Sequence, residues 1–176
     1  MALLSDKEIL EHLKRGKIRI THFQPSCLNP AGYDLRSAKE LTIEPKQHSL
    51  IATLETVELD LTIMSTLHIR SSLAREGIIG SFAVVDPGFC GQLTLNLHNN
   101  GEHVVRVRKG EPIVQIVFHK LGERATKGYS GVYQHSKGIV RSKRRQVEEA
   151  TGHLGSTPSF QQAVQHPNSY PQPPKR

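Results

Sequence analysis

The sequence has no tryptophan, only two cysteines and no apolar run long enough to cross a membrane. Cys27 and Cys90 cannot build the several disulfides of a small secreted scaffold, and neither lies in a C-x-x-C pair. A membrane-spanning helix needs about 20 consecutive apolar residues, and a secretory signal needs an apolar segment that the charged residues 1–8 do not provide. We therefore expect a cytoplasmic protein without disulfides, structural zinc or membrane contact.

Acidic residues are scarce relative to basic ones. Lysine and arginine number 23 and aspartate and glutamate 16, which gives a formal net charge of +7. This excess suits a polyanionic partner, either a nucleic acid or a nucleoside triphosphate. Aromatic residues make up only 5% of the chain, too few for strands that stack nucleic-acid bases. We expect no specific nucleic-acid partner, and a basic nucleic-acid-binding β module remains the non-enzymatic alternative.

The composition of the chain changes after residue 145. Five prolines lie within residues 157–176, with Gln, Ser and Asn between them and few residues able to build a core. We expect residues 146–176 to form a Pro/Gln-rich, disordered tail. Residues 1–145 have the length of one ordinary domain, which we expect to be catalytic.

The first domain contains one helix signal and several strand signals. Ser5 precedes Glu8 by three residues, which is a capping box and predicts a short N-terminal helix. Apolar and polar residues alternate over 57–62, 93–98 and 105–108, a period typical of half-buried antiparallel strands. Short strands separated by frequent turns favour an all-β barrel, sandwich or jelly roll.

Two polar segments are candidates for binding phosphate. The stretch R-S-S-L-A-R begins at Arg70 and ends at Arg75, so that Ser71 and Ser72 stand between two guanidinium groups. Arginine forks match phosphate geometry and hydroxyls supply short donors, although a capped helix start with solvated charges has the same pattern. Gln115 lies in an apolar run, where a buried amide needs a partner such as a ligand. An outward-facing strand residue is the alternative there.

Two carboxylates lie in or beside sequences typical of turns. Asp34 stands in A-G-Y-D-L and Asp86 in V-D-P-G-F. A carboxylate in a tight turn can orient and deprotonate a water, and one beside a glycine can hold hydrated Mg²⁺, but both are also ordinary turn residues. Phe89 could pack against a sugar or base. Residues 128–138 are rich in glycine and hydroxyls, which suits either a mobile lid over phosphates or a surface loop.

The order of these motifs resembles the dUTPase/dCTP deaminase superfamily. The resemblance covers about residues 5–145 and is strongest to archaeal-type dUTPases, through A-G-Y-D-L, R-S-S-L-A-R-E-G, V-D-P-G-F-x-G, K-G-E-P-I-V-Q and a final Gly/Tyr/Gln/Ser loop. It implies a distorted jelly-roll (β-clip) subunit and a homotrimer with active sites between subunits. It also implies Mg²⁺-dependent hydrolysis of dUTP to dUMP and pyrophosphate.

The resemblance implies a role for each candidate residue. Asp86 would activate the water that attacks the α-phosphorus, Asp34 would help hold hydrated Mg²⁺, and Phe89 would pack under the deoxyribose. Arg75 matches a position that places a water near the base in the deaminases. Six further residues would contact the triphosphate. Four would bind the phosphates, namely Arg70, Ser71, Ser72 and Gln115, and two would lie in the loop that closes over them, namely Tyr133 and Gln134.

One position separates the hydrolase from the deaminase. Deaminases of the superfamily have a catalytic glutamate ten residues after the D-P-G aspartate, and counting from Asp86 gives Asn96. A neutral amide cannot carry a proton from attacking water to leaving ammonia. We therefore predict a dUTP diphosphatase. The enzymatic alternative is a dCTP deaminase, one version of which is bifunctional and forms dUMP.

Two further departures concern the base and the closing loop. The asparagine that reads uracil in the common trimeric dUTPases is replaced by Gly80, so other groups must recognise the base. Residues 152–157 faintly resemble the glycine-rich final motif of those enzymes. We prefer residues 128–138 as the closing loop because they follow the last strong strand directly.

Overall fold

The computed structural model describes residues 2–144. Residues 1–140 form one compact unit, and residue 141 begins a second, described only over residues 141–144. The tail expected over 146–176, with its glycine-rich stretch, lies outside the described residues. No helix in the described part of the chain is long and apolar enough to span a bilayer.

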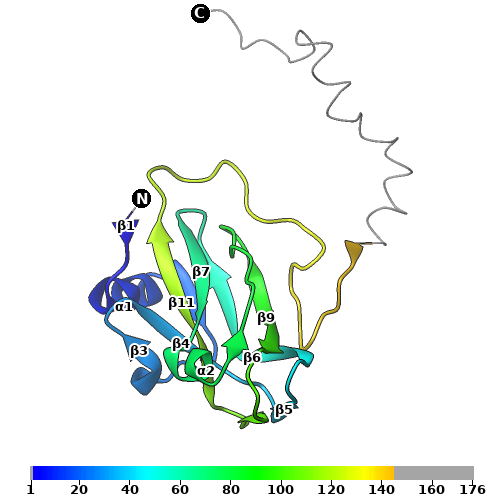
Figure 1. Cartoon of the computed structure of the whole chain (residues 1–176). Helices are drawn as coiled ribbons and strands as arrows, with labels where there is room; N and C mark the ends of the chain where they lie inside the picture. Colours follow the sequence, from blue (N-terminus) through cyan, green and yellow to red (C-terminus); the bar gives the residue numbers. More distant parts are fainter. Residues whose placement is uncertain (1, 145–176) are drawn as a thin grey trace, which may run out of the picture. The chain divides into compact units, whose positions relative to one another are not determined.

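Strand β11 (Pro112–Lys120) is the centre of a five-stranded antiparallel sheet (Figure 1). One edge pairs along most of its length with β7 (Ile63–Ile69). The other edge pairs with β4 (Gly32–Arg36) near its start and with β1 (Ala2–Leu3) near its end. Strand β3 (Leu28–Asn29) completes the sheet beside β4. Residues distant in sequence are therefore neighbours across β11.

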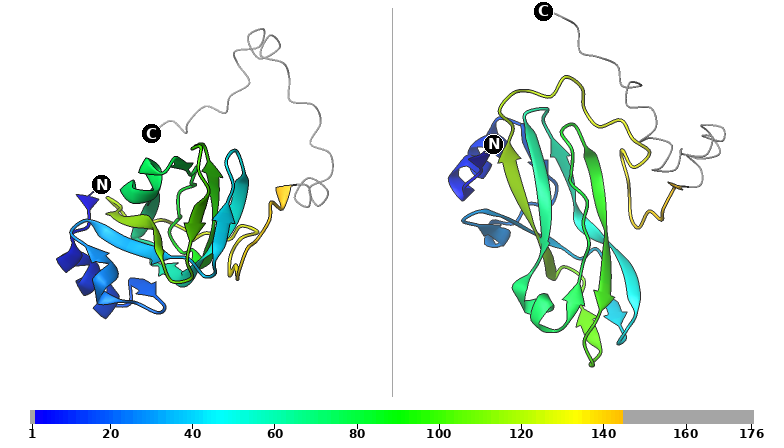
Figure 2. Two further views of the ribbon diagram at one scale, coloured as in Figure 1. Left: turned by 60° about the horizontal axis from the view of Figure 1, so that its bottom comes forward. Right: turned by 45° about the horizontal axis from the view of Figure 1, so that its top comes forward.

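The second sheet contains the two longest strands, β6 (His48–Leu59) and β9 (Cys90–Asn99), which pair antiparallel. Strand β2 (Ile18–Ile20) lies at the outer edge of β6, and β8 (Ile78–Ile79) pairs with the end of β9. Figure 2 shows the two sheets from further directions. Because β8 is so short, most of that edge of β9 is left for other segments to cover.

Two helices, a 3₁₀ turn and a strand pair complete the unit. Helix α1 (Asp6–Lys14) begins with the predicted capping box, in which the Ser5 hydroxyl accepts from the Glu8 amide. Helix α2 (Ser71–Arg75) follows β7, and the 3₁₀ turn η1 (Pro25–Cys27) precedes β3. Strands β5 (Leu41–Ile43) and β10 (Val105–Val107) pair with each other.

The core is built by alternate residues of both sheets. The predicted alternation is confirmed where Leu95, Leu97, Val105 and Val107 are buried while the residues between them are more exposed. A single cluster joins these side chains to Tyr33, Leu35, Ile116 and Phe118 from the first sheet. The expectation of an all-β, jelly-roll-like fold with a short N-terminal helix is confirmed.

Candidate active site

Three candidate residues meet across β4, β11 and the end of β7. The sheet register places Asp34 opposite Gln115. Arg70 follows β7, and its Nε lies 3.1 Å from Oδ2 of Asp34; the arginine side chain is 38% exposed and the aspartate 9%. Gly32 makes room for this arrangement, because an added Cβ would stand 3.1 Å from the Gln115 side chain and 2.5 Å from the Ile116 carbonyl oxygen. We call Asp34, Arg70 and Gln115 the phosphate cluster.

Helix α2 adds hydroxyl groups next to this cluster. Arg70 is its N-cap residue, and Ser71 and Ser72 form its exposed first turn. Arg75 lies at the other end of the helix and is also exposed. Arginine and hydroxyl donors on an accessible surface suit a phosphate ligand.

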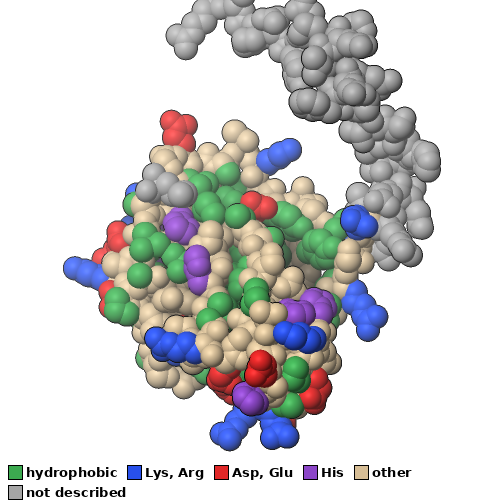
Figure 3. Space-filling model, viewed as in Figure 1, with side chains coloured by type: hydrophobic (Ala, Val, Ile, Leu, Met, Phe, Trp, Pro, Cys, Tyr) green, Lys and Arg blue, Asp and Glu red, His purple; other side chains and the backbone are tan. Residues whose placement is uncertain are grey.

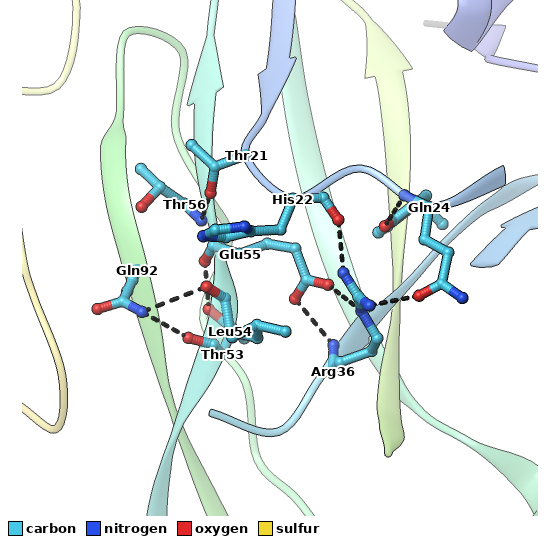
Figure 4. A network of polar contacts seen from close by, with 10 residues as sticks. Thr21, His22, Gln24, Arg36, Thr53, Leu54, Glu55, Thr56 and Gln92 are labelled. Atoms are coloured by element: carbon cyan, nitrogen blue, oxygen red, sulfur yellow. Dashed lines mark hydrogen bonds and ion pairs between the residues drawn. The ribbon is translucent and has the colours of Figure 1, made fainter. Parts of the chain in front are cut away.

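A buried ion pair fixes strand β4 below the cluster (Figure 4). Strand β6 bulges between Ala52 and Thr56, and the bulge carries the fully buried side chain of Glu55. Its Oε1 lies 2.6 Å from Nε of Arg36, and its Oε2 accepts from the Arg36 amide at 2.9 Å. The guanidinium also donates to the side chain of Gln24 and to the carbonyl of His22. Because Arg36 is two residues after Asp34, this network sets the position of the cluster's carboxylate.

The Asp86 turn lies elsewhere on the sheet. Val85 forms a bridge with Ser65 of β7, and the exposed Asp86 then opens a tight turn in which the Phe89 amide donates to its carbonyl at 3.2 Å. Gly88 holds the turn with a φ of +79°, and an added Cβ would stand 2.7 Å from Cα of Gly128. The turn therefore requires glycine both for its conformation and for the close approach of another segment.

That segment is residues 128–140, which we call the strap. In Figure 1 it is the yellow stretch that runs beside β9. The Gln92 amide donates to Ser136, the Gly138 amide donates to the Gln92 side chain, and the Val140 amide donates to the Thr94 hydroxyl. The strap follows β9 in the same direction and covers the edge that β8 leaves free. The strap is thus docked on β9 by backbone and side-chain hydrogen bonds. Its expected role as a lid over phosphates stays a prediction.

Gln134 joins the strap to the Asp86 turn. Its Oε1 accepts from the Cys90 amide at 2.9 Å, and its Nε2 donates to the carbonyls of Gly88 at 2.8 Å and Tyr129 at 3.1 Å. Both amide hydrogens and one oxygen lone pair are thereby used by backbone groups. These contacts position the loop around Gln134. The substrate contact that the resemblance implies for Gln134 stays a prediction. Tyr133 lies in the same turn, where its amide donates to the Tyr129 hydroxyl at 3.4 Å.

Phe89 lies mostly inside the core of this copy, and its expected packing under a sugar stays a prediction. Its side chain is part of the core, at 7% exposure, and its ring packs edge-on against Tyr129 at a centroid distance of 5.8 Å. Burial raises the pKa of the neighbouring Cys90 thiol, with Glu58 adding to the effect. A raised pKa disfavours the thiolate, which is the nucleophilic form of a cysteine.

The phosphate cluster and the Asp86 turn lie at opposite ends of β7. Val85 pairs with Ser65, and Arg70 lies five residues further along, or roughly 16 Å at the usual rise of a strand. The antiparallel pairing carries Asp86 still further from Arg70. In Figure 1, α2 lies at the lower end of β7, whereas β9, which follows the turn, begins at the upper end. One copy of the chain therefore does not bring Asp86 to Arg70 and Asp34.

The phosphate cluster offers a single carboxylate to a metal. Within residues 2–144, no group of three His, Cys, Asp or Glu side chains could hold a metal ion. Magnesium commonly binds through one or two carboxylates together with phosphate oxygens and waters. Asp34 thus fits Mg²⁺ that arrives with a nucleotide, and not a site made by the protein alone.

Comparison with known proteins identifies the family to which the chain belongs. The family described as dCTP deaminase-like matches residues 37–121. A relative from Thermococcus gammatolerans named dCTP deaminase is 48% identical over 144 residues, which cover 73% of this chain and 92% of the relative. The chain belongs to the dUTPase/dCTP deaminase superfamily. A relative from Aquifex aeolicus named "dCTP deaminase, dUMP-forming" is 31% identical over 84% of this chain and 97% of its own length.

A solved structure of the superfamily shows the shared fold. The EIAV dUTPase is 16% identical and covers 65% of this chain and 96% of its own, with a TM-score of 0.52. Membership confirms the resemblance read from the motifs and makes the chain a relative of enzymes of nucleotide metabolism. The specific prediction of a dUTP diphosphatase is not confirmed, because the relatives named here support the deaminase alternative better.

Asn96, the residue from which the sequence predicted a hydrolase, makes a structural contact. The Asn96 side chain, half-buried on β9, accepts from the Ser81 amide at 3.0 Å and so holds the segment that leads to Asp86. Gly80 has its own explanation, since an added Cβ would stand 2.1 Å from the Phe82 ring. Phe82 fills the space of a side chain at position 80. No sequence pattern points to Phe82, because it is a lone aromatic residue in an irregular segment.

Proposed function

We propose that this chain is an enzyme that acts on a 2′-deoxypyrimidine nucleoside triphosphate, with deamination of dCTP as the first candidate reaction. The supporting observation is the match to relatives named dCTP deaminase, at 43–48% identity over more than nine tenths of their length. The name of the Aquifex aeolicus relative adds formation of dUMP, which combines deamination with triphosphate hydrolysis.

Hydrolysis of dUTP to dUMP and pyrophosphate is the second candidate, and Asn96 favours it. The oxygen of this amide is already occupied by the Ser81 amide. A neutral amide also lacks the acid/base chemistry that would move a proton from attacking water to leaving ammonia. Asp86 in its exposed turn is the residue that would activate water for attack on the α-phosphorus.

The phosphate cluster would serve both reactions in the same way. Arg70, Ser71, Ser72 and Gln115 would hold the triphosphate, with Asp34 as the nearest carboxylate to a Mg²⁺ ion bound to it. The metal would neutralise phosphate charge, and phosphoryl chemistry depends mainly on such neutralisation and on positioning. Arg75, further along α2, would face the base end of the substrate, and Phe89 with Tyr129 would wall the site beside Asp86.

We propose further that a complete site forms between copies of the chain, as in the homotrimer that the superfamily resemblance implies. The supporting observation is the separation of Asp86 from Arg70 along β7. A second subunit would bring its own Asp86 turn to the first subunit's phosphate cluster. Closed rings of identical subunits use such unlike faces at each interface.

One assay distinguishes the candidate reactions. The purified full-length protein is given Mg²⁺ with either dCTP or dUTP, and ammonia and pyrophosphate are measured separately. Ammonia from dCTP would support the deaminase, and ammonia with pyrophosphate would support the dUMP-forming version. Pyrophosphate from dUTP alone would support the diphosphatase and the meaning given to Asn96. Neither product from either nucleotide would contradict the proposed function.

A further inference from the structure

A polar row continues the phosphate cluster across β11 onto β7. The sheet register places Gln115 between Asp34 on one side and His68 on the other. Directly paired residues of adjacent strands point to the same face, as do residues two apart on one strand. His68 therefore shares its face with Gln115 and with Arg70, two residues further along. His68 is exposed, so a ligand on this face can reach it.

The ring of His68 is oriented by a second histidine. Nε2 of His68 and Nε2 of His119 each lie 3.2 Å from the hydroxyl oxygen of Thr66. With neutral rings, a hydroxyl between two ring nitrogens donates to one of them and accepts from the other. In one direction, His119 Nε2–H donates to Thr66, and the Thr66 hydroxyl donates to Nε2 of His68. The proton of His68 then resides on Nδ1, which becomes a donor.

The phosphate cluster has too little positive charge to balance a triphosphate by itself. Arg70 is the cluster's only cation, and Asp34 already balances it at 3.1 Å. Gln115, Ser71 and Ser72 are uncharged, whereas a triphosphate carries several negative charges. In Figure 3, histidine side chains lie over the region of β11 and β7, while lysines and arginines lie mainly towards the margin of this face. The next group able to donate to an anion along the row is His68.

We propose that His68 is a further triphosphate-binding residue, and that Thr66 and His119 are positioning residues that make its Nδ1 a hydrogen-bond donor. The inference deepens the proposed function and rests on it. An anion beside His68 favours the direction of the hydrogen-bond chain that begins at His119.

Inorganic tripolyphosphate tests the inference without involving the base. Its affinity for the full-length protein is measured by calorimetry for the wild type, His68→Ala, His68→Lys and Thr66→Val. The exposed His103, in the turn after β9, supplies the control variant His103→Ala. We expect His68→Ala to weaken binding about tenfold and Thr66→Val about threefold, the scale of one hydrogen bond to a charged group and one to a neutral group. His68→Lys and His103→Ala should stay within about twofold of the wild type.

Steady-state kinetics with the nucleotide that the protein turns over provide the second readout. His68→Ala should raise KM while kcat stays within about twofold, because the lost contact holds the phosphates in the ground state as well as the transition state. Rescue by lysine distinguishes a binding role from a structural one, because lysine supplies a cation but cannot accept the hydrogen bond that the Thr66 hydroxyl gives to Nε2 of His68. Unchanged tripolyphosphate affinity and KM in His68→Ala, in a protein that turns over nucleotide, would overturn the inference and leave the proposed function standing. A wild type with neither turnover nor binding would overturn both.

Discussion

The carboxylate of Asp86 and that of Glu55 illustrate two opposite uses of an acidic residue. Asp86 is exposed in a turn closed by backbone contacts, so its side chain is available to a water. Glu55 is fully buried and satisfied by the guanidinium and amide of Arg36. Substitution should therefore affect chemistry at the first residue and stability at the second.

The variant Asp86→Asn should keep its fold and bind nucleotide but lose hydrolysis of the triphosphate by about three orders of magnitude. The amide has nearly the same shape but cannot take a proton from water, and general-base catalysis commonly contributes a factor of this size. Turnover is measured by pyrophosphate release, and binding by calorimetry with a non-hydrolysable analogue. The variant Glu102→Gln, at an exposed position, is the control. Near-normal turnover by Asp86→Asn would contradict the role assigned to Asp86.

The variant Glu55→Ala should lower the free energy of unfolding by about 3–5 kcal/mol, because it leaves the guanidinium of Arg36, 13% exposed, without its partner. Glu55→Gln should cost less, since its oxygen can still accept from the Arg36 amide. Chemical denaturation followed by circular dichroism measures both. Glu58→Ala, which removes a partly exposed pair with Arg19, is the control and should cost about 1 kcal/mol or less. Equal effects of Glu55→Ala and Glu58→Ala would refute the structural role of the buried pair.

At the scale of elements, the strap and the Asp86 turn form one unit. The Gln134 side chain makes three hydrogen bonds to the backbone, one each with Gly88, Cys90 and Tyr129. The Tyr129 amide also donates to the carbonyl of Pro87 at 2.8 Å. These contacts cover an edge of β9 that would otherwise present unpaired backbone groups, a feature that promotes aggregation. The strap therefore protects the edge and also positions the turn that carries Asp86.

The variant Gln134→Ala should loosen this turn. We expect faster hydrogen exchange at the Cys90 amide, which loses its acceptor, and a fall in kcat of about tenfold from misplacement of Asp86. Gln47→Ala removes a comparable contact, to the Glu44 amide, in the turn before β6 and should change neither quantity. A raised KM with normal kcat and unchanged exchange would instead indicate that Gln134 contacts the substrate.

At the scale of the whole molecule, a site shared between subunits predicts complementation. Asp86→Asn and Arg70→Ala should each be nearly inactive alone. Co-refolded as mixed assemblies, they should regain activity at about a quarter of the sites, since half of the phosphate clusters and half of the Asp86 turns are intact and they combine at random. Pyrophosphate or ammonia release measures the recovery, and mixtures of one variant with itself are the control. No recovery in verified mixed assemblies would place the whole site within one chain.

The boundary proposed after residue 145 predicts an autonomous catalytic domain. A chain ending at residue 145 keeps both sheets, the strap and every candidate site residue. It should therefore retain its oligomeric state by light scattering and its kcat/KM within about twofold, as expected when a polar terminal segment is removed. Loss of turnover with the assembly intact would instead assign the closing loop to residues 152–157.

Local patterns in the sequence determined the strands, the first helix and the family. Alternation identifies a half-buried strand because side chains of successive residues point to opposite faces, and Ser5 with Glu8 identifies the start of α1 because capping acts within one turn. The motifs around Asp34, Arg70, Asp86 and Gln115 identified the superfamily without any long-range contact.

Only the tertiary structure decided which of these residues meet. Sheet register places Asp34, Gln115 and His68 in one row, although their sequence separations carry no sign of it. It also separates Asp86 from Arg70 at opposite ends of β7. Gln134, which the resemblance places in the closing loop, hydrogen-bonds to backbone groups more than forty residues away, and no local pattern in the sequence shows these partners. The physical reason is the same each time: propensities and caps act between neighbours in the chain, whereas register and hydrogen-bond partners are set by pairing between distant strands.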